Sequence, residues 1–183
     1  MIERIIRVAL ECLLVRRGYV SLHAAAVEVQ GKAYAFTGPS GIGKSSRADA
    51  WRQALGASLI SGDRPLICVR DLMLYGVPWD GKEQCFRNVC FPLEAIFEVR
   101  RSDSVNALEM DFSQRRILMR SQCFIPMWDT ETASIQLKNI MHLAESANII
   151  SAFCGASLDD ARELYKLSGR DNKHQYTHVY DKN

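Results

Sequence analysis

Apolar residues recur at helical spacing in four parts of the chain. Residues 2–17 place isoleucine and leucine three and four positions apart with charged residues between them, and this pattern ends near Gly18. Similar patterns predict helices over residues 45–55, 132–146 and 158–167. The sequence therefore predicts an amphipathic helix at the start of the chain, one in its first third and two near its end.

Short β-rich runs fill most of the remaining sequence up to residue 110. Residues 19–29 and the apolar run 33–37 flank the tight turn Gln30-Gly31-Lys32, which predicts a hairpin or two adjacent strands. Further strands are predicted at 58–60, 66–69, 73–75 and 93–100, with 106–110 as a strand or a short connection. The polar and turn-rich residues 76–88 predict a loop.

The mixture of elements and the composition together predict the fold class. The 183 residues are 48% hydrophobic and 24% charged, which is typical of a globular protein with a core. Strands and helices mix without strict β–α–β alternation, so we expect an α/β or α+β fold with a mixed β-sheet and flanking helices. We expect one domain over residues 1–183, in which the polar residues 170–183 form a frayed tail.

Charge and cysteine content exclude several classes of protein. With 23 basic and 21 acidic residues the net charge is +2, which argues against a nucleic-acid partner. Charged residues interrupt the first helix, and this argues against a signal peptide or a membrane span. Six cysteines without a CxxC pair are typical of free thiols in a reducing compartment. We expect a cytoplasmic protein without a membrane partner. The sequence is compatible with a monomer or a homo-oligomer.

The strongest motif is a glycine-rich segment that matches GxxxxGK[ST] completely. Glycines let the backbone curl so that successive N–H groups point at phosphate oxygens, and the helix that follows presents its positive end to the same anion. The lysine of such a loop reaches the β- and γ-phosphates, and the next hydroxyl binds Mg²⁺. We expect ATP, or another nucleoside triphosphate, and Mg²⁺ to bind at Gly38, Pro39, Ser40, Gly41, Ile42, Gly43, Lys44, Ser45 and Ser46.

The surroundings of this segment favour a phosphate-binding loop over a chance glycine-rich turn. The predicted strand 33–37 enters the segment and the predicted helix 45–55 leaves it, which is the strand–loop–helix arrangement that such loops require. The motif predicts nucleotide binding but does not by itself identify the reaction.

Two further residues are candidates for the chemistry. Asp63 ends the predicted strand 58–60, so it is a candidate metal ligand or base, and the alternative is an aspartate that caps a turn. His23 lies among small apolar residues just before the strand of the glycine-rich loop, where a structural histidine is the more common case. Trp79 and Lys82 fit a substrate loop, but a surface turn with a solvated lysine is preferred there.

Three segments together resemble a known family of kinases. They are Ser21-Leu-His23-Ala-Ala-Ala-Val-Glu28, Phe36-Thr-Gly38-Pro-Ser-Gly-Ile-Gly-Lys44-Ser45 and Leu59-Ile-Ser-Gly-Asp63-Arg64. Over residues 19 to 70 the chain is similar to the catalytic core of the HPr kinase/phosphorylase family, a serine kinase fold related to phosphoenolpyruvate carboxykinase. Residues 76–82 are similar to small single-domain relatives of that kinase.

The resemblance implies a role for each candidate residue. It implies that His23 lies near the transferred phosphate, that Lys44 and Ser45 hold phosphate and Mg²⁺, and that Asp63 binds metal or acts as a base. The chain departs from the family at Gly62, where the family has a second acid beside the first. Either Asp63 holds the metal and His23 assists the nucleophile, or the base comes from elsewhere.

The expected function is therefore transfer of the γ-phosphate of ATP to a hydroxyl of a protein, a peptide or a small metabolite. The expected catalytic residues are His23, Lys44 and Asp63, with Ser45 and Asp63 as the metal ligands. The absence of an acid at Gly62 favours an alternative, a nucleotide-binding sensor or assembly module with a degenerate site. A third alternative is an enzyme closer to phosphoenolpyruvate carboxykinase that acts on a small carboxylate.

Overall fold

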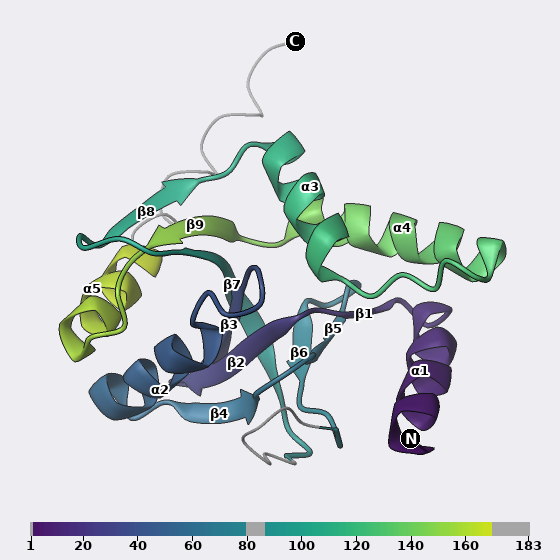
Figure 1. The fold of residues 1–183 in the computed structure, drawn as a ribbon, viewed down its shortest axis with the longest axis horizontal. Helices are drawn as coiled ribbons and strands as arrows, with labels where there is room; N and C mark the ends of the chain where they lie inside the picture. Colours follow the sequence, from purple (N-terminus) through teal and green to yellow (C-terminus); the bar gives the residue numbers. More distant parts are fainter. Residues whose placement is uncertain (1, 80–86, 170–183) are drawn as a thin grey trace, which may run out of the picture.

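Nine strands form one mixed sheet in the computed structural model, which describes residues 2–79 and 87–169 (Figure 1). The strands run in the order β1-β5-β6-β7-β3-β2-β4, and β9 pairs with β7 and β8 beside this path. Their bounds are β1 Tyr19–Ser21, β2 Ala24–Val29, β3 Lys32–Thr37, β4 Ser58–Ser61, β5 Leu66–Cys68, β6 Met73–Tyr75, β7 Cys90–Arg100, β8 Asn106–Glu109 and β9 Ile149–Phe153. The expected α/β chain with a mixed sheet is confirmed.

Helices cover both faces of this sheet. The described residues form five helices: α1 Ile2–Val15, α2 Lys44–Leu55, α3 Phe112–Gln122, α4 Thr130–Ser146 and α5 Leu158–Ser168. Buried side chains of α3 and α4 share one hydrophobic cluster with the sheet, and those of α2 and α5 share the other. Figure 1 shows α2 and α5 together on one side and α3 and α4 on the other. No helix of the described residues is long and apolar enough to cross a membrane.

Alternation along the central strands creates these two clusters. In β2, Ala24 and Ala26 face the α3/α4 side, whereas Ala25 and Val27 face the α2/α5 side. The β3 strand alternates in the same way, because successive side chains of a strand point to opposite faces. Both strands are buried over nearly their whole length, and this explains why they read as continuous apolar runs in the sequence.

The pairing of four strands brings several loops to one edge of the sheet. β2 is antiparallel to β3 and β4, with Ala24 opposite Thr37 and Ala26 opposite Ser61. β3 is parallel to β7, with Thr37 beside Glu98. The start of β2 therefore lies at the same edge as the ends of β3, β4 and β7.

Most predicted elements are present, but two were not predicted. The hairpin around residues 30–32 and the pairing of 66–68 with 73–75 are confirmed. Helix α3 was not predicted because its sequence is polar. Its start is marked by a capping box, in which the side chains of Asp111 and Gln114 each accept a hydrogen bond from the other residue's backbone N–H. Strand β9 is a short apolar run directly after a helix, where periodicity cannot separate strand from helix. The predicted tail 170–183 lies outside the described residues.

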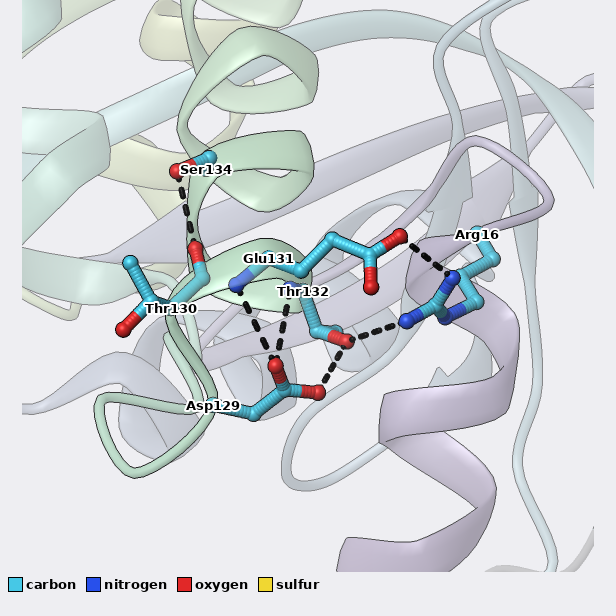
Figure 2. A network of polar contacts seen from close by, with 6 residues as sticks. All are labelled: Arg16, Asp129, Thr130, Glu131, Thr132 and Ser134. Carbon is cyan, nitrogen blue, oxygen red and sulfur yellow. Dashed lines mark hydrogen bonds and ion pairs between the residues drawn. The ribbon is translucent and has the colours of Figure 1, made fainter.

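Helix α1 is joined to the start of α4 by a polar network (Figure 2). The Asp129 side chain accepts hydrogen bonds from the backbone N–H groups of Glu131 and Thr132, which caps α4. From the end of α1, Arg16 donates to the Glu131 carboxylate at 3.0 Å and to the Thr132 hydroxyl at 3.3 Å. Hydrogen bonds from Thr132 hold the pKa of Asp129 below its usual range, so the cap stays charged.

The predicted N-terminal helix is confirmed, and its apolar stripe lies on the exposed side. Ile5, Ile6 and Leu13 are mostly exposed, whereas Glu11 and Val15 are buried. This arrangement is the reverse of that in an ordinary surface helix, which buries its apolar stripe.

Candidate functional site

The glycine-rich loop joins the end of β3 to the start of α2. Gly38, Gly41 and Gly43 have φ values of 140°, 78° and 100°, which a residue with a side chain rarely adopts. A Cβ atom at Gly43 would also lie 2.5 Å from Nη1 of Arg47. The three glycines of the motif are thus required by the path of the backbone itself.

The N-terminus of α2 lacks a side-chain cap and has no acidic residue in its first turn. By contrast, α3, α4 and α5 are all capped by side chains. An uncapped N-terminus leaves donor N–H groups and partial positive charge for an anion. Ser45 and Ser46 lie in this first turn, and Pro39 and Ser40 are exposed in the loop before it. Together the loop and the helix end form a place where a phosphate group can bind.

Lys44 folds over the loop. Its Nζ donates to the carbonyl of Gly38 at 3.0 Å and to that of Pro39 at 3.2 Å. Burial lowers the pKa of Lys44, and the nearby Asp63 carboxylate acts in the opposite direction. The ammonium group therefore lies against the backbone of the loop.

Two arginines outside the motif hold the loop in place. Arg47 is buried and donates from Nη1 to the carbonyls of Ile42 and Gly43, and from Nη2 to the carbonyl of Cys154 at 2.5 Å. Arg101, which follows β7, donates to the carbonyl of Gly41 at 2.7 Å. The two arginine side chains thus tie the loop to the ends of β7 and β9 through hydrogen bonds to backbone carbonyls. No local motif specifies these bonds.

The Arg47→Met substitution is expected to lower the free energy of unfolding by about 2–3 kcal/mol, because buried carbonyls lose charged donors. Urea denaturation monitored by circular dichroism measures this change. The control is Arg52→Met on the same helix, where the arginine pairs with Asp49 at the exposed surface. Equal midpoints for the two variants would show that Arg47 does not hold the loop.

His23 and Asp63 approach the same edge of the sheet from β2 and β4. The backbone of His23 is fixed on both sides, because its N–H donates to Gln122 at 2.8 Å and its carbonyl accepts from the Thr37 hydroxyl at 2.9 Å. Burial and the charge of Lys44 lower the pKa of His23, whereas Asp63 raises it. Because the charges of Lys44 and Asp63 both act on this imidazole, the three residues lie within electrostatic range of one another at this edge of the sheet.

The structure adds two charged residues that the sequence did not identify as part of the site. Arg64 has a left-handed backbone with φ of 51°, and its charge acts on both His23 and Glu11. Glu11 of α1 is buried and accepts a hydrogen bond from the Ser21 hydroxyl at 2.8 Å. Burial raises the pKa of Glu11. In the sequence, only the charge of Glu11 within an otherwise apolar stretch of α1 could have indicated that this residue has a polar partner.

The remaining predicted residues fall outside this group. Trp79 is buried rather than exposed to a substrate. Lys82 lies outside the described residues. Of the cysteines, Cys12, Cys68, Cys90, Cys123 and Cys154 are free thiols.

The donor set fits a magnesium–nucleotide complex. Within the described part of the chain, no three His, Cys, Asp or Glu side chains gather as a metal site. A nucleotide-bound Mg²⁺ does not need such a cluster, since it takes one or two protein ligands and fills its other positions with phosphate and water. One hydroxyl from Ser45 and one carboxylate from Asp63 would be the protein ligands of such a metal ion.

Comparison of the chain with models of known protein families and with curated proteins gives no match.

Proposed function

We propose that this protein is an ATP-dependent kinase that transfers the γ-phosphate to a hydroxyl, with an HPr-kinase-like site. The observation that supports it most is the convergence of Lys44, Asp63 and His23 beside an uncapped helix N-terminus. A cationic group at the phosphates, a carboxylate for the metal and a base for the nucleophile are parts that phosphoryl transfer uses, and a neutral imidazole can be that base.

Each residue has a distinct part in the proposed reaction. Backbone N–H groups of residues 38–46 bind the phosphates, and the Lys44 ammonium balances charge on the transferred group. Ser45 and Asp63 hold Mg²⁺, which neutralises phosphate charge when bound. His23 has a lowered pKa, so its imidazole is unprotonated at neutral pH and can accept the proton of the attacking hydroxyl.

The Asp63→Asn substitution is expected to lower the affinity for Mg²⁺ on the order of 10- to 100-fold, as the loss of a metal-site partner typically does. The amide keeps the shape of the side chain but removes its charge. The Ser61 hydroxyl bonds the Asp63 backbone carbonyl at 2.8 Å, so the turn and the melting temperature should be retained.

Two measurements test this result. One is turnover of ATP across a Mg²⁺ titration, and the other is Mn²⁺ binding by electron paramagnetic resonance with a non-hydrolysable ATP analogue. The exposed Asp103, substituted by Asn, is the matched control. If Asp63→Asn binds the metal with wild-type affinity, Asp63 is not a metal ligand and has only the role of a turn residue.

A nucleotide-binding sensor is the second candidate, and Gly62 favours it because the second acid of the resemblance is absent. A sensor binds ATP without consuming it. Release of inorganic phosphate from ATP, or its transfer to a hydroxyl acceptor, separates the two candidates. Tight ATP binding with no turnover would favour the sensor.

A further inference from the structure

Helices α3 and α4 enclose a groove on the face that they turn away from the sheet. Its wall on α3 consists of Ser113, Arg116, Ile117 and Arg120, and its wall on α4 of Leu137, Ile140 and Met141. These positions follow the spacing of one helical stripe on each helix. The groove has a volume of about 540 Å³, which lies within the range of ligand-binding clefts.

Exposed apolar side chains line part of this α3/α4 groove, whereas Ile140 in its α4 wall is buried. Ile117 is 72% exposed and Leu137 is 37% exposed, and Phe112 at the start of α3 is 40% exposed. Leu118 and Met119 on the other side of α3 are buried against the sheet, so Ile117 is not needed for the core. Apolar side chains gathered in a groove with a polar rim mark an interaction surface.

The charge of the groove is of one sign. Arg116 and Arg120 lie one turn apart in its wall, and none of the described residues that line it is acidic. Arg116 stacks over the Phe112 ring at 5.5 Å, which holds its guanidinium at the rim. Guanidinium groups in fixed positions prefer carboxylates, which they bind in a bidentate manner.

The geometry points to a docking site for a segment of a partner protein that carries apolar side chains flanked by carboxylates. The apolar side chains would fill the space between Ile117 and Leu137, and the carboxylates would pair with Arg116 and Arg120. An amphipathic helix in a groove is a common form of such recognition. This inference does not depend on the proposed kinase reaction.

A second copy of the chain fits the groove less well. The main exposed apolar face of the described residues lies on α1, with Ile5, Ile6 and Leu13. Among the side chains of α1 that the structure describes, the acidic Glu11 is buried, so this face offers no described carboxylate to Arg116 and Arg120.

The groove also adjoins the candidate site. Helix α3 has 11 residues, so it spans about 16 Å at ~1.5 Å per residue. Its last residue, Gln122, accepts the backbone N–H of His23. A bound partner segment would therefore lie within one helix length of His23.

The test is selection of random peptides of about 16 residues on the full chain without nucleotide. We expect the selected peptides to share apolar residues with Asp or Glu, and to bind the Arg116→Glu/Arg120→Glu variant at least about tenfold more weakly. Ile117→Glu should weaken them as well, and hydrogen exchange should slow over residues 113–120 when they bind. Melting temperatures confirm that the variants fold.

Two controls separate this groove from other surfaces. Leu13→Glu places the same change on an equally apolar, exposed position of α1, and Lys44→Ala removes the nucleotide lysine; neither should change peptide binding. The inference is overturned if no peptide is selected, if the peptides are basic, or if the groove variants bind them like the wild type. It is also overturned if sedimentation shows a dimer that Ile117→Glu dissociates, because the occupant would then be a second copy.

Discussion

Replacement of Lys44 by alanine is expected to slow phosphate transfer by about 100-fold or more, the usual cost of removing a dominant electrostatic contact. The Lys44 ammonium lies over the loop, bound to the carbonyls of Gly38 and Pro39. Its contacts are with backbone carbonyls at the partly exposed loop, so its loss should leave the fold intact. The measurement is release of phosphate from ATP, or its transfer to a hydroxyl acceptor, together with the melting temperature.

Two variants make the Lys44 result specific. Arg52→Ala removes a cation from the exposed side of the same helix and should leave turnover unchanged. Lys44→Arg keeps the charge but not the shape, so it should recover only part of the rate. Turnover of Lys44→Ala at the wild-type level would mean that the glycine-rich loop is not the catalytic site.

The His23→Ala substitution is expected to slow transfer by roughly 100- to 10,000-fold, the range of general acid–base assistance. ATP affinity measured by calorimetry should stay within a few-fold of the wild type, because the proposed role of His23 is on the acceptor hydroxyl and not on the nucleotide. A structural histidine would instead lower stability, nucleotide affinity and activity together, since its removal leaves partners unpaired. A stable variant with unchanged affinity and turnover would eliminate the catalytic role.

The pH dependence gives His23 a second, independent test. Burial and Lys44 lower its pKa from the ordinary value of 6.5. The unprotonated imidazole is the active form, so the rate should stay level as the pH falls past 6.5 and decrease only near the lowered pKa. This decrease should disappear from the residual activity of His23→Ala. A rate that falls at or above the ordinary pKa would contradict the assignment.

Much of the candidate site could be predicted because it is local in sequence. Residues 38–45 carry the glycines, the lysine and the hydroxyl of the loop in one contiguous segment, and the flanking strand and helix are as predicted. The φ values of Gly38, Gly41 and Gly43 explain why a short motif is so informative. By contrast, the long-range contacts of Arg47 and Arg101 could not be predicted. Arg47 bonds Cys154, which is 107 residues away, and Arg101 bonds Gly41, which is 60 residues away.

The same distinction explains the elements that were missed. Helix α3 is polar and is held by Leu118 and Met119 against a sheet whose strands lie far away in the sequence. Strand β9 becomes a strand because β7 offers it a parallel edge, with Ile96 beside Ile149. Local pattern does not by itself identify either segment, and burial in the tertiary structure decides their conformation.

The sequence by itself determined the α/β class with a mixed sheet, the strand–loop–helix unit and the identity of the candidate residues, because alternation and glycine conformation act over a few neighbouring positions. Only the tertiary structure decided that His23, Lys44 and Asp63 share one edge. That edge results from the antiparallel pairing of β2 with both β3 and β4, which reverses the direction of β2 and brings its first residue to the ends of its neighbours. It also decided that Glu11 and Arg64 join this region and that α3 and α4 enclose a groove with two arginines. Such contacts depend on how distant elements pack, and no window of the sequence contains them.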